Sequence, residues 1–347
     1  MTHTTSHTNE LFSGDEPSGI NGGSGAGLRP LGDGFNIGSL YVPNRLVQAP
    51  MAGISGSAFR LQARRFGAGL VTTEMISSYG IHYHNRRTQA MLKLTEEEHP
   101  VSVQIFGNDA GVMVEAALAA EAAGADVIDI NMGCPVRKVV KTGAGVALMG
   151  DAELASRVTA AVSDAVSIPV TVKIRSGLKR EITAPEFAKK LVQAGASAIC
   201  IHPRLAIQGQ KGWADHSVSA ALAVSLGVPV IASGDVARPG QASSLIKNGC
   251  AAVMIGRASL GNPWIYRDLL DGVEPSRRPA GEVLSEMSCF YRDVVIEMGE
   301  ERASRYMRKF YGWFLKTFRP DAGLRDGLRR AGSFADALEL MRECFEN

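Results

Sequence analysis

Short apolar runs recur at regular intervals between about residue 46 and residue 255. They are rich in Val, Ile and Ala, and they are apolar at successive positions rather than at alternating ones. Strands of this kind are covered on both faces, which is typical of a parallel sheet. We therefore predict eight parallel strands, at residues 46–49, 70–73, 101–105, 127–131, 170–174, 198–202, 228–232 and 252–255.

Two styles of strand entry alternate along the chain. The third, fifth and seventh runs begin at a proline, whereas the second, fourth, sixth and eighth follow a glycine that suits the end of a helix. In a closed (β/α)8 barrel, alternate strands fill alternate layers of the core, so this alternation predicts a TIM barrel. A doubly wound sheet is the alternative, but no Gly-x-Gly-x-x-Gly follows the first strand. Helices are predicted between the runs, for example at residues 111–123, 152–166, 185–194 and 241–247.

The two ends of the chain differ from the repeating middle. Residues 1–35 are rich in Thr, Ser, Gly and Asn, a composition that predicts a disordered tail. After about residue 270 the strand pattern stops, and helices are predicted at 282–299, 302–318 and 335–344. We thus predict a tail at 1–35, a barrel at 36–272 and a small C-terminal helical bundle at 273–347.

Composition narrows the class of protein. Of the 347 residues, 45% are apolar and 21% are charged, which is typical of a globular protein with a large core. No apolar run is long enough to cross a bilayer, and no signal-peptide pattern begins the chain. The five cysteines show no metal-ligand spacing, so we expect a cytoplasmic protein without disulfides or a metal site.

Polar side chains close most of the predicted strands. In a barrel the carboxyl ends of all strands meet on one face, where active sites form. Six polar residues at that face predict a site there. They are Gln104, Asn131, Lys173, His202, Ser233 and Arg257.

The last two strand ends suit a phosphate. Ser233, Gly234 and Asp235 follow the seventh strand, and Gly256 and Arg257 follow the eighth. Loops at these places commonly hold phosphate through backbone N–H groups and an arginine. Two tight turns that need glycine are the alternative for each loop alone, but their joint position favours a cofactor phosphate.

Lys173 and Gln104 narrow the choice of cofactor. A lysine that closes a buried strand needs an anionic or strongly accepting partner. The reduced isoalloxazine ring of a flavin is such a partner, and Gln104 would donate beside Lys173. A Schiff-base lysine and a salt bridge with Asp129 are the alternatives.

Cys134 lies in a Gly-Cys-Pro turn just beyond the fourth strand, where a packing role would be unusual. Because Arg137, Lys138 and Lys141 follow it, we expect its pKa to be lowered. The thiol suits a nucleophile or a proton donor, and the residues alone leave both open.

Several of these residues fall within longer motifs. They are Ala-Pro-Met-Ala-Gly-Ile at 49–54, Asn-Met-Gly-Cys-Pro at 131–135, Val-Lys-Ile-Arg at 172–175, His-Pro-Arg at 202–204 and Gly-Arg at 256–257. In this order and spacing the chain resembles the tRNA-dihydrouridine synthase family, most closely its bacterial B-type branch. The resemblance extends from about residue 46 to the C-terminus.

The resemblance implies an FMN-dependent enzyme that reduces the C5=C6 bond of tRNA uridines with NADPH or NADH. It implies that Cys134 protonates C5 while flavin N5 delivers hydride to C6. Independently of the resemblance, we expect a monomer. The residues that it implies for FMN binding are Pro50, Met51, Ala52, Gln104, Lys173, His202, Ser233, Gly234, Asp235, Gly256 and Arg257.

A basic stretch suits an RNA substrate. Residues 303–330 hold eight basic and two acidic residues, with Tyr306, Tyr311 and Trp313 among them. The alternative is a solvated helix face with core aromatics, whereas the resemblance implies that the C-terminal helices bind tRNA. Candidate tRNA contacts are Asn131, Arg204, Arg305, Arg308 and Lys309, with His82, His84, Arg86 and Arg87 in the second βα loop as further candidates.

The chain departs from the family pattern near the predicted uridine site. Ser233 and Pro203 stand where the family usually has asparagine and glycine, and Leu205 and Ala206 replace a threonine and an arginine. These changes bear on uridine recognition more than on FMN. The alternative functions are a small-molecule FMN reductase of the dihydroorotate or enoate type, and an RNA-binding module on an inactive barrel.

Overall fold

The computed structural model describes residues 30–346, and its main body is a closed barrel of parallel strands. The order is β3-β11-β10-β9-β8-β7-β6-β4, and a parallel bridge between Val47 and Leu70 joins the two ends. A short β5 (Ile76–Ser77) extends the sheet beside β6. The predicted TIM barrel is therefore confirmed. Its strands are β3 (Leu46–Gln48), β4 (Val71–Thr72), β6 (Val101–Phe106), β7 (Val127–Met132), β8 (Val170–Gly177), β9 (Ala198–Leu205), β10 (Val230–Ser233) and β11 (Ala252–Ile255).

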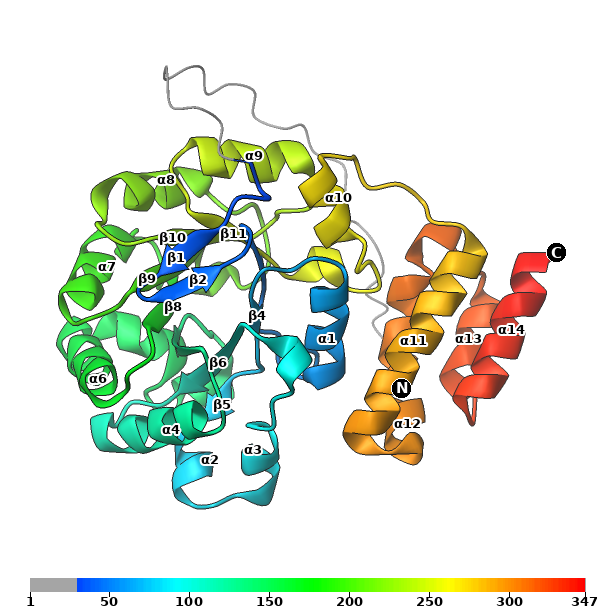
Figure 1. The fold of residues 1–347 in the computed structure, drawn as a ribbon, viewed down its shortest axis with the longest axis horizontal. Coiled ribbons are helices and arrows are strands. Elements are labelled where there is room, and N and C mark those ends of the chain that lie inside the picture. Colours follow the sequence, from blue (N-terminus) through cyan, green and yellow to red (C-terminus); the bar gives the residue numbers. More distant parts are fainter. Residues whose placement is uncertain (1–29, 347) are drawn as a thin grey trace, which may run out of the picture.

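Helices surround the barrel, as Figure 1 shows. The glycines expected to end helices do so: Gly124 and Gly195 have φ of +96° and +100°, a conformation that costs glycine little. Asp109 and Asp151 start two of the helices by accepting hydrogen bonds from Val112 N and Leu154 N. The surrounding helices are α1 (Ser57–Arg65), α2 (Ser78–His82), α3 (Arg86–Ala90), α4 (Ala110–Ala122), α5 (Arg137–Val140), α6 (Ala152–Ala165), α7 (Ala184–Gln193), α8 (His216–Ser225), α9 (Pro239–Lys247) and α10 (Ile265–Asp271).

A two-stranded hairpin that the apolar pattern did not predict closes one end of the barrel. It consists of β1 (Phe35–Ile37) and β2 (Leu40–Val42), paired antiparallel. Ile37 and Val42 are fully buried and belong to the same apolar cluster as Val47, Ala198 and Ile231 of the barrel strands. The barrel interior is therefore apolar at the hairpin end.

The expected N-terminal tail, residues 1–35, falls only partly within the structure. Residues 1–29 lie outside the described residues. At residues 30–35 the chain packs against the barrel, with Leu31 and Phe35 buried. These two side chains are isolated in a glycine-rich stretch, so no local periodicity indicated their burial.

The C-terminal helices form a bundle beside the barrel (Figure 1). Phe290 and Phe310 pack at its centre with ring centroids 4.8 Å apart, and Phe310 also contacts Phe59 of the barrel. Salt bridges from Arg65 to Asp293 and Glu286 tie the bundle to α1. No helix between residues 30 and 346 is long and apolar enough to cross a membrane. The bundle helices are α11 (Ala280–Met298), α12 (Glu300–Phe314), α13 (Ala322–Arg330), which was not predicted, and α14 (Phe334–Glu346).

Candidate active site

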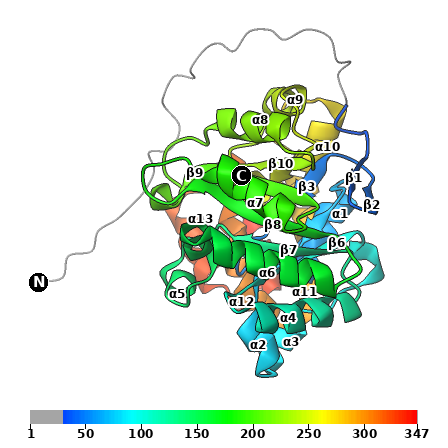
Figure 2. The same ribbon diagram turned by 90° about the vertical axis from the view of Figure 1, so that its left-hand side faces the viewer.

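The polar strand ends meet at the end of the barrel opposite the hairpin. Figure 2 shows β1 and β2 at one end and α5, with the loop after β9, at the other. Strand register brings the predicted residues together, since Asn131 pairs with Lys173 and Arg175 pairs with His202. This mouth therefore gathers side chains that lie far apart in the sequence.

A chain of hydrogen bonds crosses three strands beneath the mouth. Thr171 Oγ1 and Gln104 Nε2 both donate to the Asp129 carboxylate, each at 2.6 Å. Asn131 Nδ2 donates to Gln104 Oε1 at 2.8 Å, and Asn131 Oδ1 accepts from Cys134 N at 3.0 Å. Thr171 was not among the predicted site residues, and Asp129 was predicted only as an alternative salt-bridge partner of Lys173. Its carboxylate faces the barrel interior.

Asp129 is only 3% exposed. Burial raises its pKa to about 6, although the hydrogen bonds from Gln104 and Thr171 and the charge of Lys173 act in the opposite direction. The alternative of a salt bridge between Lys173 and Asp129 is not observed.

Lys173 is half-buried at the mouth. Its ammonium makes no hydrogen bond or salt bridge with any residue that the structure describes, although burial of an unpaired charge is costly. The side chain is therefore free to donate to an acceptor that enters the mouth. A flavin ring, with its carbonyl and ring-nitrogen acceptors, is a group of that kind.

His202 has a defined protonation state. Burial, together with the charges of Lys173, Arg175, Arg204 and Arg257, lowers its pKa to about 2. Its Nε2 lies 3.0 Å from the Arg204 guanidinium, which can only donate. His202 is therefore neutral, with Nε2 as the acceptor and the proton on Nδ1, from where it can donate to a ligand.

Cys134 is half-buried in the turn after β7. The expectation that neighbouring cations lower its pKa is wrong: burial raises the pKa above its ordinary value. Arg137 and Lys138 are exposed on α5, and the cations that partly oppose the burial are Arg175 and Lys173. The thiol thus stays protonated at neutral pH, which favours a proton donor over a nucleophile.

Asp235, in the loop after β10, forms salt bridges with two arginines. Its carboxylate binds Arg204 at 2.5 Å and Arg257 at 2.9 Å. Arg204 is 2% exposed and also donates to Gly212 O at 2.6 Å, so it holds the loop after β9 in place. Arg204 therefore does not project toward a large substrate, and the Asp235 carboxylate orients Arg257.

The loop after β10 approaches its neighbours closely. Gly234 has a φ of +112°, and a Cβ there would lie 2.9 Å from the His202 ring. The His216 ring bonds Gly234 O at 2.8 Å, and Arg257 on the next loop is half-exposed. An anion near Gly234 and Arg257 could pair with the Arg257 guanidinium, and at Gly234 no side chain would obstruct it. The donors at the mouth thus fit FMN, with acceptors for Lys173 and His202 and a phosphate for Arg257.

The loop after β3, which contains Pro50, Met51 and Ala52, is held from both sides. Ser55 Oγ accepts from Met51 N at 2.9 Å, while Tyr306 OH of the bundle donates to Ile54 O at 3.1 Å. Lys309 of the bundle donates to Gly53 O, and its ammonium lies 3.5 Å from the centre of the Tyr306 ring. Lys309, predicted as a tRNA contact, thus attaches the bundle to the barrel.

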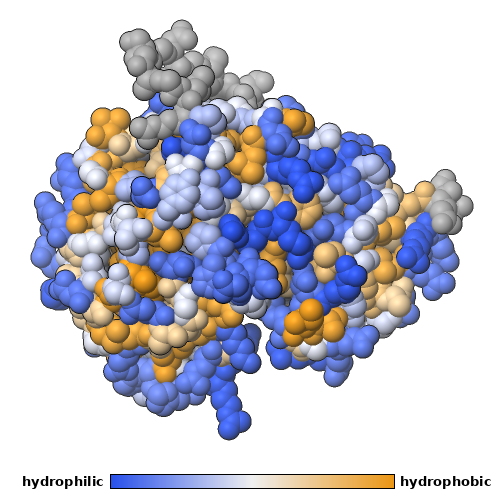
Figure 3. All heavy atoms as spheres, in the orientation of Figure 1, coloured by the Kyte–Doolittle hydropathy of each residue, from blue (hydrophilic) through white to orange (hydrophobic). Residues whose placement is uncertain are grey.

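Other members of the basic stretch also have intramolecular partners. Arg305 is 61% exposed and pairs with Glu301 at 3.3 Å, and Arg308 donates to Ala331 O at 2.9 Å. Tyr311 is buried and Trp313 packs against the bundle core, so these aromatics match the core alternative. In the second βα loop, His82 pairs with Glu115 at 2.7 Å. Figure 3 shows hydrophilic surface across the junction of barrel and bundle.

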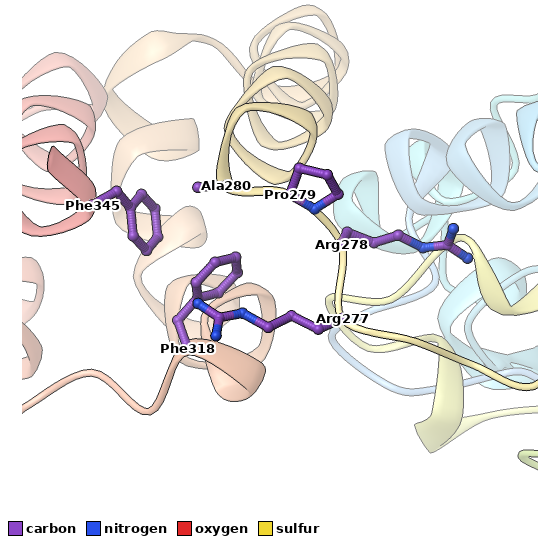
Figure 4. Close-up of a pocket in the computed structure, with 6 residues that line it drawn as sticks. All are labelled: Arg277, Arg278, Pro279, Ala280, Phe318 and Phe345. Atoms are coloured by element: carbon purple, nitrogen blue, oxygen red, sulfur yellow. The ribbon is translucent and has the colours of Figure 1, made fainter.

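A pocket of about 360 Å³ lies away from these residues, where the barrel connects to the bundle. Figure 4 shows Arg277, Phe318 and Phe345 around it, with the Arg277 guanidinium 4.5 Å from the centre of the Phe318 ring. It shares no residue with the barrel mouth.

Known proteins are similar to this chain over most of its length. The Dihydrouridine synthase (Dus) family profile matches residues 47–347. The tRNA-dihydrouridine synthase B of Pseudomonas aeruginosa is 39% identical over 81% of this chain and 86% of its own length. A probable tRNA-dihydrouridine synthase of Rhizobium leguminosarum is 40% identical over 81% of this chain and 88% of its own length.

Solved structures share the fold at low identity. Morphinone reductase aligns with a TM-score of 0.56 and 16% identity, over 74% of this chain and 94% of its own. A histamine dehydrogenase from a Rhizobium species aligns with a TM-score of 0.58 and 12% identity, over 70% of this chain and 48% of its own.

Proposed function

Because this chain belongs to the dihydrouridine synthase family, we propose that it reduces the C5=C6 bond of uridine in tRNA. The barrel mouth would hold FMN, which, with NADPH or NADH as the reductant, would supply the hydride for C6 of the uracil ring. The thiol of Cys134 gives its proton to C5, and the resulting thiolate takes a proton from water. The observation that carries this proposal is a thiol kept protonated by burial, near Lys173 and Arg175, in a turn held at the mouth by the Asn131 side chain.

The remaining residues of the mouth bind the cofactor and orient it. Lys173, the Nδ1–H of His202 and the second N–H of the Gln104 amide donate to acceptors of the flavin ring and ribityl chain. Pro50, Met51 and Ala52 pack against the ring. The backbone of Ser233, Gly234 and Gly256 and the guanidinium of Arg257 hold the phosphate, while Asp235 orients Arg257.

Binding of tRNA requires surfaces beyond the barrel mouth. To reach a base within folded tRNA, the enzyme must extrude it and hold the surrounding backbone. Asn131 lies at the mouth and contacts the uridine, whereas Arg305 and other exposed cations of the bundle contact phosphates. The protein acts as a monomer in the cytoplasm, where tRNA is found.

The test is dihydrouridine formation in uridine-rich tRNA incubated with protein, FMN and NADPH. Native protein should form dihydrouridine, and Cys134→Ala should bind FMN normally but lose at least about 100-fold in rate, since general acid catalysis contributes roughly 10²–10⁴-fold. Cys289→Ala, at a half-buried cysteine of α11, is the matched control and should keep native activity. A protein that binds FMN and oxidises NADPH but leaves tRNA unchanged would instead be a small-molecule reductase.

A further inference from the structure

One buried acid has no part in the reaction proposed above. Asp129 lies on β7, two residues before Asn131, and is only 3% exposed. A carboxylate in a barrel interior is costly unless hydrogen bonds compensate for the lost water. Its two bonds, from Gln104 Nε2 and Thr171 Oγ1, are both 2.6 Å long.

The carboxylate is one end of a continuous chain that reaches the reacting thiol. Gln104 Oε1 accepts from Asn131 Nδ2 at 2.8 Å. Asn131 Oδ1 accepts from Cys134 N at 3.0 Å and from Gly133 N at 3.2 Å. Two side-chain amides therefore connect Asp129 to the backbone that carries the thiol.

Both ends of this hydrogen-bond chain require the same orientation of the two side-chain amides. A carboxylate only accepts, so Asp129 requires the NH2 group of Gln104. A backbone N–H only donates, so Cys134 requires the carbonyl oxygen of Asn131. The Gln104 oxygen and the Asn131 nitrogen then face each other as acceptor and donor. Turning either amide over would bring two donors or two acceptors together.

We propose that Asp129 is a positioning residue, which acts through Gln104 and Asn131 to hold the Cys134 turn in the geometry needed for proton transfer. The inference rests on the proposed function, because it assigns the proton transfer to Cys134. Without the carboxylate, Gln104 Nε2 loses its acceptor and the amide is no longer held in place. Asn131 then loses a fixed partner, and the thiol moves. A displacement of about 1 Å from the reacting geometry can cost about 100-fold in rate.

Three variants distinguish the role of Asp129 as a hydrogen-bond acceptor, which orients the amides, from the role of its negative charge. Asp129→Ala removes the acceptor and should slow uridine reduction about 10- to 100-fold. KM for tRNA and the rate of flavin reduction by NADPH should change by a smaller factor, because Asn131 and Gln104 also contact the uridine and the flavin. Asp129→Asn should stay within a fewfold of native, because its oxygen accepts from Gln104 and its NH2 donates to the Thr171 hydroxyl, which also accepts. Asp129→Asn with Thr171→Val leaves the Asn NH2 without its acceptor, so the Asn amide is no longer held in one orientation and the rate should fall below that of Asp129→Asn.

The rate of alkylation of Cys134 by iodoacetamide, followed by peptide mass spectrometry, reports thiol position without activity. Asp129→Ala should change this rate severalfold while Cys289 reacts as in the native protein, and Asp129→Asn should restore it. If Asp129→Ala does not fold, the Asn variant and its Thr171→Val combination still make the comparison.

Two results would overturn the proposal. One is native turnover and native Cys134 alkylation in Asp129→Ala. The other is an Asn variant as slow as the Ala variant, because the charge rather than the direction of the chain would then matter. If the native protein forms no dihydrouridine, the proposed function fails, whereas the alkylation comparison still decides whether Asp129 positions the thiol.

Discussion

Individual side chains at the mouth owe their chemistry to burial more than to neighbouring charge. Cys134 is followed by three cations in the sequence, yet desolvation raises its pKa. His202 is held neutral by the same effect, together with four surrounding cations. At this scale the site consists of hydrogen-bond donors: a thiol, an imidazole N–H and an ammonium.

The raised pKa of Cys134 predicts slow alkylation at neutral pH. Iodoacetamide reacts with thiolate, so at pH 7.5 Cys134 should react more slowly than free cysteine, whose pKa is about 8.5. The rate should still be rising above that pH. Peptide mass spectrometry over pH 7–10 measures the profile. A rate that reaches its plateau below pH 8 would instead indicate a nucleophilic thiolate.

Asp129 predicts a pH-dependent stability. Its folded-state pKa of about 6 lies above the unfolded value of 3.8, so the folded protein holds a proton that the unfolded chain has released. Stability attributable to Asp129 therefore falls as pH rises from about 4 to about 6, by about 3 kcal/mol at 1.4 kcal/mol per pKa unit.

Asp129→Asn removes this titration. Relative to native protein, the variant should gain about 3 kcal/mol of unfolding free energy between pH 4 and pH 7. Urea unfolding at several pH values measures the difference, and Asp164→Asn, at an exposed position of α6, is the control. A native–variant difference that does not change with pH would contradict the assignment.

At the scale of elements, the loops of the mouth are held by buried charged groups. Arg204 donates to the carbonyls of Lys211 and Gly212 in the loop after β9, and Asp235, after β10, accepts from Ala214 N of the same loop. Arg175 of β8 donates to Leu205 O and Gly209 O. These contacts hold two neighbouring loops together without a large apolar core of their own.

Removing the carboxylate of Asp235 should loosen both loops. Asp235→Ala leaves Arg204, which is 2% exposed, without its anion, and breaking a buried pair in this way costs about 3–5 kcal/mol. FMN affinity should fall as well, because Arg257 loses its orienting partner. Asp215→Ala, which removes only the cap of α8, should cost about 1 kcal/mol. Equal losses in the two variants, measured by urea unfolding, would refute this account of Asp235.

At the scale of the whole molecule, the bundle completes the barrel as well as extending it. Phe310 packs against Phe59 of α1, and Tyr306 and Lys309 bond the backbone of the loop after β3. That loop carries Pro50, Met51 and Ala52, so the predicted flavin contacts depend on bundle residues for their support. We propose the remaining exposed cations of the bundle as the RNA contacts.

A substitution at Arg305 tests whether the exposed cations of the bundle bind RNA. Arg305→Glu should weaken tRNA binding and lower the slope of log affinity against log salt by about 1, as expected for one lost phosphate contact. Lys189→Glu makes the same change of charge on α7, on the opposite side of the molecule from α12 (Figure 1), and should have little effect. Filter binding at several salt concentrations measures both. Equal effects would show that total charge, and not this surface, determines affinity.

The sequence alone determined the barrel and the place of its site. Eight apolar runs with alternating glycine and proline entries are local signals, and polar residues at strand ends must meet once the strands are parallel. The same reasoning predicted three of the four bundle helices, whereas α13 carries Gly323 and Gly327 and lacks a continuous apolar pattern. The hairpin β1–β2 is too short to show a period of its own.

Only the tertiary structure decided how the site works. Every residue of β7 is buried, so burial alone did not show which face points inward; the alternation of Asp129 and Asn131 with Ile128 and Ile130 was the signal that places Asp129 on the same face as Asn131. The pairing of Arg204 with Asp235 and of Lys309 with Gly53 joins residues that lie 31 and 256 positions apart. The direction of the Cys134 pKa shift also depends on such distant neighbours, because desolvation depends on all the atoms that surround the thiol in space, whereas the sequence shows only the residues beside it in the chain.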